Sequence, residues 1–534
     1  MRHLFLDRRA AGRPPRIAWR AGLLSMLTSL LTAFAGVEAA EKAHESDAAA
    51  RKPNVLWFIV DDMSANFSCY GEPTISTPNV DRLAREGTRF RHAFVTAPVC
   101  SACRSALITG MYQTSIGAHQ HRSGRGTEKI QLPAGVEPIP GLMQRAGYYT
   151  CIGDGLIAAP TAASPGGRSA KPRKARLGKT DYNFEWDASI YDGDDWSGRA
   201  AGQPFFMQVQ LPGGKLRLET TESAERLAKK ALDELGSATS VDKVELPPYY
   251  PRVRELLVDW AAYLDAVRFT DKHVGDVLAR LEREGVLEET LVIFMTDHGI
   301  SHARGKQFLY DEGVHVPLVI HGPGVGKGVE RTDLVEHIDL AAVTLSAAGI
   351  PLPAKMQGRD ILASDYRPRD AVFAARDRCD ETVDRLRSVR TDRFLYIRNF
   401  HPQRPLLQPN AYKDGKTILQ TLRRLHAAGS LPTLSEQLLF APSRPAEELY
   451  EWPVDRWQVH NLAHDEAHRA TLEQLRSRLD RWIVETGDRG PEGPRGYESE
   501  MEVYLNDIRR RSPEQAGIIE RNMAVMKKWA SEGK

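Results

Sequence analysis

A cysteine placed where a loop runs into a helix is the first candidate for chemistry in this chain. Residues 98–110 have the character of a loop that enters a helix near Cys100. A side chain at a helix N-terminus meets free backbone N–H groups and the positive end of the helix dipole. Arg104 follows four residues later and therefore lies on the same helical face. Both features favour an anionic group at Cys100, although a buried, inert cysteine is the plain alternative.

Polar residues close two apolar stretches that have the character of strands. One stretch ends in Asp61-Asp62 and the other in Asp297-His298. Because parallel strands bring their carboxyl ends to one edge of a sheet, we expect these side chains to meet. Carboxylates suit hard cations, so Ca²⁺ is the first expectation and Mg²⁺ the second, with Cys100 as the fifth group. Aspartates at strand ends also form turns, which is the structural alternative.

The elements that must position these residues indicate an α/β fold. The continuous apolar runs at 54–60 and 290–296 are typical of strands buried on both faces. Helical patterns separate them, including one that begins at Thr77-Pro78 and a long one over 253–285. We therefore predict a large, mostly parallel sheet flanked by helices.

Composition divides the chain into four segments. Residues 1–40 combine a basic segment, an apolar run and small residues, as a secretory signal peptide does. Residues 41–52 form a polar linker, 53–365 the catalytic domain, and 366–534 a smaller α+β subdomain with a charged tail. We expect an exported protein, periplasmic or secreted, without a stable membrane span after cleavage. An uncleaved anchor is the alternative, because the apolar run is borderline for a span.

Charge argues against a nucleic-acid partner. The chain has a formal net charge of +2. Residues 1–40 hold six arginines against Asp7 and Glu38, a net of +4, so the remainder carries +2 minus +4, or −2. A nucleic-acid surface would need the opposite balance.

The run Cys100-x-Ala102-x-Arg104, closed by Thr109-Gly110, resembles the signature of the type I sulfatases, which belong to the alkaline phosphatase superfamily. In that family the cysteine is oxidised to formylglycine, whose hydrate is the nucleophile. The resemblance implies that a formylglycine-generating or sulfatase-maturing enzyme converts Cys100 and that Arg104 orients the hydrate. Most members have proline where this chain has Ala102, which bears on the choice of maturation enzyme.

Further segments extend the resemblance. The surroundings of the two acidic pairs look like the family's metal motifs, and residues 306–313 resemble the segment whose lysine holds the sulfate oxygens. The implied activity is hydrolysis of a sulfuric ester or sulfamate on a sulfated carbohydrate. The implied metal ligands are Asp61, Asp62, Cys100, Asp297 and His298, and the implied sulfate clamp is Lys306.

The family's two acid/base histidines are absent from their usual places. After the strand at 205–211, where a histidine is customary, the chain has Pro212-Gly213-Gly214-Lys215. We predict that His302 transfers the proton, since histidine suits this task near neutral pH, with His119 and His121 as the alternative pair and a lysine or water after them. The predicted substrate-binding residues are Lys179, Lys215, His119, His121 and Arg387.

Residues 386–389 and 448–450 look like the sulfamidase branch, which removes N-sulfate from glucosamine, so glycosaminoglycan degradation is the expected context. Two alternatives stay open at this point. One is a catalytically silent, exported anion- or saccharide-binding protein on a sulfatase scaffold. The other is a phosphatase or phosphodiesterase of the same superfamily, which would use a serine or threonine nucleophile.

Overall fold

The computed structural model describes residues 52–156, 177–217 and 220–534. The predicted signal peptide and nearly all of the predicted linker lie outside these ranges. Residues 53–534 form one compact unit. Among the described residues, no helix is both long and apolar enough to cross a membrane.

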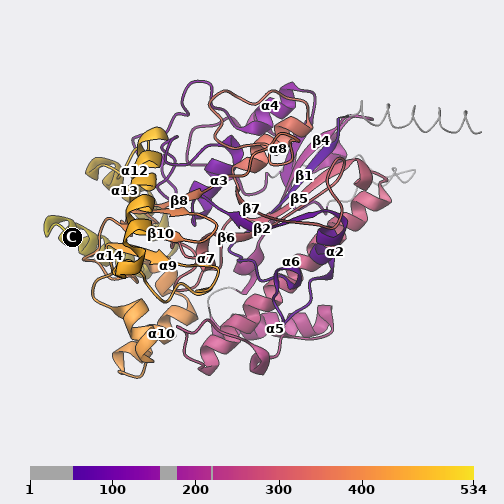
Figure 1. Ribbon diagram of the computed structural model, residues 1–534. Coiled ribbons are helices and arrows are strands. Elements are labelled where there is room, and N and C mark those ends of the chain that lie inside the picture. Colours follow the sequence, from indigo (N-terminus) through magenta and orange to yellow (C-terminus); the bar gives the residue numbers. More distant parts are fainter. Residues whose placement is uncertain (1–51, 157–176, 218–219) are drawn as a thin grey trace, which may run out of the picture. The chain divides into compact units, whose positions relative to one another are not determined.

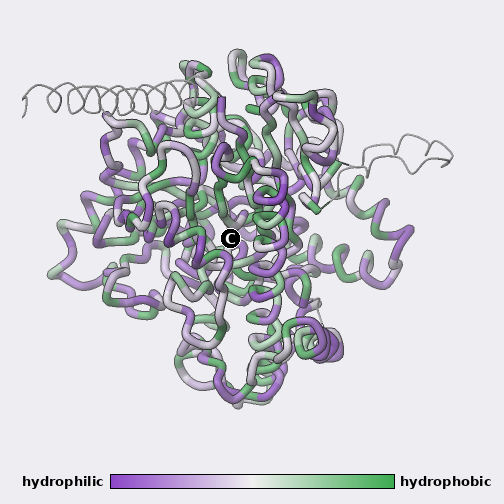
Figure 2. The backbone as a smooth tube through the Cα atoms, turned by 90° about the vertical axis from the view of Figure 1, so that its right-hand side faces the viewer, coloured by the Kyte–Doolittle hydropathy of each residue, from purple (hydrophilic) through white to green (hydrophobic). Residues whose placement is uncertain are grey.

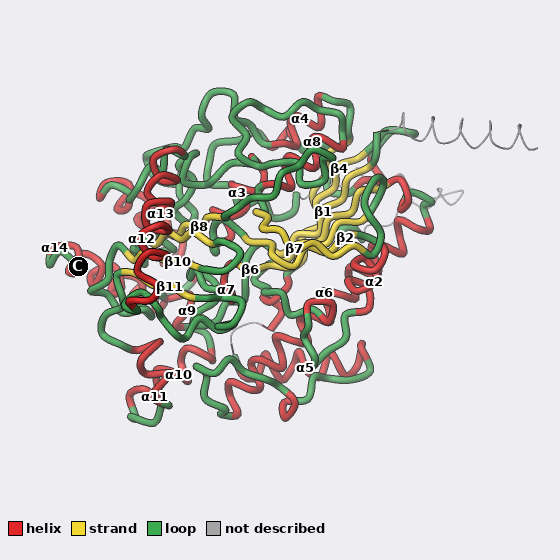
Figure 3. Tube along the Cα trace, viewed as in Figure 1, coloured by secondary structure: helices red, strands yellow, loops and turns green. Residues whose placement is uncertain are grey.

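A seven-stranded sheet dominates the unit, with the strand order β3-β4-β1-β5-β6-β2-β7 (Figure 3). Neighbouring strands are parallel except that β6 runs antiparallel to both β5 and β2. The predicted large, mostly parallel sheet is therefore confirmed. The strands are β1 (Asn54–Val60), β2 (Thr88–Phe94), β3 (Tyr149–Gly153), β4 (Phe205–Leu211), β5 (Thr290–Thr296), β6 (His315–His321) and β7 (Val329–Glu336).

The central strands β4, β1 and β5 end level with one another. Val60 pairs with Leu211 on one side and with Thr296 on the other. All seven residues of β1 and of β5 are buried, which explains their uninterrupted apolar sequences. Whatever follows Val60, Leu211 and Thr296 must therefore gather at a single edge of the sheet.

Helices cover the sheet (Figure 1). The outer helices alternate between hydrophilic and hydrophobic residues (Figure 2), as expected when one face packs inward and the other meets water. The longest, α6, has 30 residues and ends close to the start of β5. The helices of this part are α2 (Pro78–Glu86), α3 (Cys100–Thr109), α4 (Ile139–Arg145), α5 (Thr221–Leu235), α6 (Arg254–Arg283), α7 (Asp311–Val314) and α8 (Asp339–Ala347).

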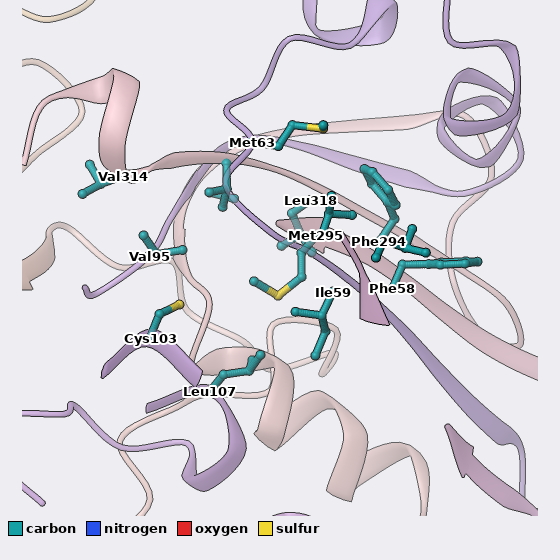
Figure 4. Packing of buried hydrophobic residues seen from close by; sticks show 14 of the residues in the cluster. Phe58, Ile59, Met63, Val95, Cys103, Leu107, Phe294, Met295, Val314 and Leu318 are labelled. Carbon is teal, nitrogen blue, oxygen red and sulfur yellow. The ribbon is translucent and has the colours of Figure 1, made fainter. Parts of the chain in front are cut away.

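Helix α3 packs directly on the sheet. Cys103 and Leu107, one turn apart on this helix, lie beside Ile59 and Met295 of the two central strands (Figure 4). Every residue of α3 is buried. The helix is thereby fixed against the strands, and its first residue is held at the carboxyl edge of the sheet.

A second, antiparallel sheet forms the C-terminal part, with the order β11-β10-β9-β8. Helix α12 packs on β9 and β10, and α13 packs on α14. The predicted α+β character of this part is confirmed, whereas the predicted boundary at residue 365 stays a prediction. The elements are β8 (Val372–Arg376), β9 (Leu386–Arg390), β10 (Leu395–Asn399), β11 (Glu447–Tyr450), α9 (Ala411–Asp414), α10 (Thr417–Ala427), α11 (Thr433–Ser435), α12 (Arg469–Glu485), α13 (Pro494–Arg511) and α14 (Pro513–Ser531).

Candidate active site

Cys100, the first residue of α3, lies among charged side chains that follow different strands. Its Sγ atom is 3.1 Å from Nε2 of His298 and 3.2 Å from Nζ of Lys306. The carboxylate of Asp62 and the ammonium group of Lys215 follow at 3.8 Å and 4.0 Å. Because Cys100 is only 3% exposed, these four groups are its immediate surroundings.

The environment of Cys100 favours a negative charge. Burial raises the pKa of the thiol, because a thiolate loses hydration inside the protein. The positive charges of Lys179, Lys215 and Lys306 are the main effects that outweigh burial, and they lower the pKa to about 7. An anionic group at this position is therefore stabilised, as the sequence predicts.

Cys103 provides an internal contrast on the same helix. Burial and the neighbouring charge of Asp297 raise the pKa of Cys103 well above its usual value. Its Sγ atom contacts the backbone oxygen of Asp297 and belongs to the hydrophobic core. Cys103 is therefore a packing residue, and Cys100 is the cysteine that faces charged groups.

Oxygen and nitrogen atoms suited to a cation converge beside Cys100. One carboxylate oxygen of Asp62 and one of Asp297 lie 3.4 Å and 3.5 Å from Nε2 of His298. Nδ1 of His298 is 2.9 Å from the carbonyl oxygen of Gly299, which assigns the proton to Nδ1 and leaves the Nε2 lone pair for a metal. Asp62, Cys100 and His298 are all buried and offer ligand atoms within 4.8 Å of one another. This donor set fits a divalent cation.

Two further features mark the strand ends as a constrained region. Asp62 has a φ of 52°, a left-handed conformation that residues other than glycine seldom adopt and that is often found at functional sites. Arg104 donates from Nε to Asp297 at 3.2 Å and from Nη2 to Asp61, so it ties the ends of β5 and β1 together. Asp61, a predicted metal ligand, thus lies on the Arg104 side of the cluster in this structure.

Lys179 and Lys215 both reach Asp61. Nζ of Lys179 is 2.9 Å from one oxygen of Asp61, and Nζ of Lys215 is 2.5 Å from the other. Lys215 can approach because Gly213 and Gly214 carry no Cβ atom. A Cβ atom at Gly213 would lie 2.1 Å from the backbone oxygen of Asp61, and one at Gly214 would lie 2.1 Å from that of Asp62. Glycines at both positions are required for this close passage of backbone past backbone.

The charges of the cluster are balanced before any cation binds. Four carboxylates, those of Asp61, Asp62, Asp181 and Asp297, meet four cationic side chains, which are Arg104, Lys179, Lys215 and Lys306. A divalent cation would therefore leave the cluster with an excess of positive charge. A cavity of about 620 Å³ opens beside the cluster and is lined in part by Asp61, Lys179 and Gln210.

His302 lies in a different cluster. Its Nε2 atom is 2.7 Å from Asp259 and also contacts Arg217, and its ring stacks on Trp260 at 4.7 Å. Burial and the Arg217 charge lower the pKa of His302 to about 3. The ring is fully buried and faces these partners instead of Cys100, so this geometry does not support the predicted proton-transfer role.

The remaining predicted substrate-binding residues are buried and engaged. Nε2 of His119 is 2.8 Å from the backbone oxygen of Gly490. Nδ1 of His121 accepts from the hydroxyl of Ser101 at 2.8 Å, and burial lowers the pKa of His121 well below its usual value. Arg387 is fully buried between two aspartates, Asp377 and Asp488. Only Lys179 and Lys215 of this predicted set reach the Cys100 cluster directly.

Comparison with known proteins fits this geometry. The Sulfatase family model matches residues 53–350, and the model "N-sulphoglucosamine sulphohydrolase, C-terminal" matches residues 298–406. An ulvan-active sulfatase of Formosa agariphila is 30% identical over 478 residues, which cover 82% of this chain and 76% of that protein. The chain belongs to the sulfatase family.

Two further proteins agree with this assignment. The N-sulphoglucosamine sulphohydrolase of Homo sapiens is 27% identical, with 82% of this chain and 91% of that protein covered. A solved 2-O GAG sulfatase superposes with a TM-score of 0.57 at 17% identity, covering 84% of this chain and 96% of that one, and so shares the fold. The predicted family, fold and enzyme class are thus confirmed.

Two residues of this sulfatase-family site were not predicted from the sequence. The hydroxyl of Tyr412, on α9, donates to Asp62 at 2.9 Å, and its ring lies 4.8 Å from Nζ of Lys306. Gln210, the penultimate residue of β4, accepts from Arg104. No sequence signal marks Tyr412, whereas the position of Gln210 at the end of a buried strand could have indicated it.

The charged C-terminal tail supports the loop that follows α3. Glu500 of α13 accepts from the backbone N–H groups of Gly124, Arg125 and Gly126 at 2.8, 3.2 and 3.1 Å. Arg122 precedes this stretch. Burial lowers the pKa of Arg122, but the negative charges of Asp380, most strongly, and of Cys100 raise it above its usual value. The tail of this sulfatase-family chain therefore fixes a loop at the border of the Cys100 cluster.

Proposed function

We propose that this protein hydrolyses a sulfate or sulfamate group of a carbohydrate, with formylglycine derived from Cys100 and with a bound divalent cation, Ca²⁺ before Mg²⁺. The convergence of lysine side chains on Cys100 is the observation that carries the proposal, since Nζ of Lys306 and Nζ of Lys215 lie 3.2 Å and 4.0 Å from its Sγ atom. A monoanionic sulfate ester is attracted by such a site, which also stabilises charge that develops in the transition state.

Formylglycine at position 100 would supply, as its hydrate, the attacking oxygen and a second hydroxyl through which sulfate is later expelled. The position suits an oxyanion, since the α3 N-terminus and the lysines that lower the Cys100 pKa favour negative charge there. Arg104, one helical turn onward, holds Asp61 and Asp297 in place.

Asp62, Asp297 and His298 would hold the cation, with Asp61 available at the same edge. When bound, a divalent cation supplies Lewis-acid stabilisation of oxygen charge. Tyr412 and Lys306 both donate to Asp62 and so keep that carboxylate oriented.

Lys306, Lys215 and Lys179 would contact the sulfate oxygens. Burial lowers the pKa of Lys306 and of Lys215, but the charges of Asp62 and Cys100 outweigh it and raise both, so these groups stay protonated at neutral pH. Charged donors bind sulfate oxygens more strongly than neutral ones.

Proton transfer to the leaving group falls to Lys215 in this proposal. Its side chain is 35% exposed, which lets the ammonium group meet both solvent and the reaction centre. No histidine among the described residues contacts Cys100 Sγ except His298, which is assigned to the cation.

The proposed substrate class is supported by the relatives, whose names refer to ulvan and to N-sulphoglucosamine. The C-terminal model match favours a sulfated amino sugar over other carbohydrates. Export of the protein to the periplasm or medium is part of the proposal and rests on the predicted signal peptide at residues 1–40.

One set of assays tests the proposal. The protein is produced with and without a formylglycine-generating enzyme, and mass spectrometry of the peptide that contains Cys100 reports conversion. The converted form is expected to cleave an aryl sulfate and to release sulfate from N- or O-sulfated glucosamine. Activity on an aryl phosphate alone would indicate a phosphatase, and binding of sulfated sugar without turnover would indicate a silent binding protein.

Two Lys215 variants test the proton-transfer step. Lys215→Arg keeps the charge but cannot give up a proton, whereas Lys215→Ala loses both. We expect both variants to slow turnover of a poor leaving group by about 10²-fold. An activated aryl sulfate, which needs no proton, should respond to Lys215→Ala only. Normal turnover of the poor leaving group by Lys215→Arg would assign the proton to water.

A further inference from the structure

A second cavity, of about 470 Å³, lies between helix α12 and the start of β8 and is lined by arginine and aromatic side chains. We propose that this cavity is a separate binding site for a sulfated saccharide and engages a part of the substrate chain remote from Cys100. The proposal rests on the proposed function for its ligand class, and the cavity contains none of the residues of the Cys100 cluster.

The cavity and the Cys100 cluster share an edge of the sheet. Tyr112, which lines the cavity, comes three residues after the end of α3 and donates to Glu336, the last residue of β7. Cys100 begins α3, and ten helical residues span about 15 Å. Three strand spacings from β5 to β7 give a similar separation of about 14 Å. A chain of a few sugar rings is long enough to span this separation.

One wall of the cavity is aromatic. The ring of Trp482, on α12, stacks on Phe373 of β8 with centroids 5.0 Å apart and planes 5° apart. Tyr112 meets the same indole edge-to-face at 5.1 Å. Figure 1 shows α12 beside β8. Trp482 and Tyr112 are only 5% and 8% exposed and Phe373 is half-buried, so this wall is rigid and offers a narrow apolar strip to the C–H groups of a sugar ring.

Arginines supply the polar wall, and two of them have no ion-pair partner among the described residues. Arg369 is buried against Glu336 and Asp339, and Arg478 pairs with the exposed Asp370. Arg359 and Arg481 are exposed and form no ion pair within the part of the chain that the structure describes. The lining also includes the exposed carboxylate of Glu485. The other acidic residues at the cavity are already paired with Arg369 and Arg478. Glu485 then faces the two cations Arg359 and Arg481, so the cavity carries a net positive charge.

One buried donor of the same cavity also lacks an acceptor among the described residues. Nε1 of Trp482, a residue only 5% exposed, has no hydrogen-bond partner there, whereas Nε of Arg369 lies 3.4 Å from Glu336 in an ion pair. Buried polar atoms in proteins are nearly always paired, so such orphans require an explanation. The three groups without a partner in the described part of the chain, which are Nε1 of Trp482 and the side chains of Arg359 and Arg481, are donors only. The complementary ligand is therefore rich in acceptors and negatively charged.

A sulfated saccharide meets these requirements together. Its sulfate oxygens accept hydrogen bonds from planar guanidinium groups, and its rings match the aromatic wall. The volume lies in the range of small-ligand cavities. A site of this kind would raise the affinity for long chains without taking part in the chemistry, because two linked contacts act together.

The test separates long from short ligands. Protein with unconverted Cys100, which should bind without turnover, is titrated calorimetrically with a heparin dodecasaccharide and with a heparin disaccharide. We expect Arg359→Ala/Arg481→Ala to weaken dodecasaccharide binding about tenfold, as loss of two charged contacts implies, and to leave disaccharide binding unchanged. Trp482→Phe, which keeps an aromatic ring but removes the N–H donor, should weaken binding of the dodecasaccharide by a smaller factor.

The control variant, Arg254→Ala/Lys327→Ala, removes two exposed cations that do not line the cavity and should change neither affinity. Equal dodecasaccharide affinity in the cavity variant and this control would overturn the proposal. The proposal would also be overturned if an unsulfated heparosan dodecasaccharide bound as tightly as the heparin dodecasaccharide, because the cavity would then not recognise sulfate groups. In the converted enzyme, aryl sulfate turnover should stay within about twofold in every variant. Absence of that turnover in the unmutated enzyme would refute the proposed function and leave the calorimetric result to stand by itself.

Discussion

The clusters around Cys100 and His302 are both buried, both charged and both built at the carboxyl edge of the sheet, yet they differ in their access to solvent. In the His302 cluster, Asp259 pairs with Arg217 and with the imidazole, and none of these three side chains is more than 9% exposed. In the Cys100 cluster, two of the lysine side chains, Lys179 and Lys215, are about one-third exposed.

This difference indicates which buried polar clusters can bind a ligand. Charged groups that pair with one another away from solvent stabilise one another but cannot be reached by a substrate, so their altered pKa values report structure. A cluster whose cations reach solvent can exchange an internal ion pair for a bound anion. Buried polar side chains alone do not separate the two cases, but access to solvent does.

Removing the nucleophile should have the largest effect. We expect Cys100→Ala to lower aryl sulfate turnover by at least about 10³-fold, because the attacking group is lost, without lowering the melting temperature. Cys103→Ala is the matched variant on the same helix. It should destabilise the protein through the cavity left in the core and change turnover of the folded fraction little. Turnover by Cys100→Ala near the normal rate would place the nucleophile elsewhere.

Loss of one carboxylate should next separate the clusters by metal affinity. Asp297→Asn removes a charged oxygen ligand. We expect the Ca²⁺ affinity, measured by calorimetric titration, to fall more than about 100-fold, which exceeds the loss caused by changing a residue that only orients a metal ligand. Asp259→Asn alters a carboxylate that is equally enclosed but lies in the His302 cluster. Its Ca²⁺ affinity should match that of the unmutated protein, and a drop there would mean that the cation lies in the other cluster.

His302→Gln should act on stability more than on catalysis. Within the folded fraction we expect turnover to stay within about threefold, since the ring faces Asp259 and Arg217. The free energy of unfolding should fall by about 1–3 kcal/mol as buried hydrogen-bonding groups lose their partner. A 10²-fold loss of turnover with unchanged stability would restore the role predicted from sequence.

The same residue makes stability depend on pH. Its pKa is about 3 in the folded protein against about 6.5 in an unfolded chain, so the unfolded state binds more protons in between. The contribution of His302 is therefore fully present above pH 6.5 and is lost as the pH falls toward 3. Urea unfolding at pH 7 and pH 5 should show a smaller decline for His302→Gln than for the unmutated protein; an equal decline would assign the slope to other groups.

The smallest effect concerns the border of the Cys100 cluster. Glu500→Gln weakens three backbone contacts of the loop that carries Arg122, so KM for a sulfated saccharide should rise by a few fold while kcat is kept. Hydrogen exchange of residues 124–126 should speed up in parallel. Glu498→Gln, on the same helix but in an exposed ion pair with Lys527, is the control and should change neither.

Local sequence determined the framework of this protein. The apolar runs of β1 and β5, the acidic pairs behind them and the spacing from Cys100 to Arg104 are short-range patterns, and short-range patterns specify strands, helix starts and strand ends. Parallel pairing then brings the two strand ends together, which is why the meeting of Asp62, Asp297 and His298 could be predicted.

The directions of single side chains that belong to no local motif depend on tertiary packing. His302 lies between predicted site residues in the sequence, yet its ring points toward Asp259. The carboxylate of Asp259, on α6, is buried and requires a hydrogen-bond partner, which His302 provides. Tyr412 and Glu500 reach the site from 350 and 376 residues away in sequence, as their bonds to Asp62 and Gly124 record. No local pattern encodes such contacts, because they depend on how distant elements pack, and packing fixes the direction and the neighbours of each side chain.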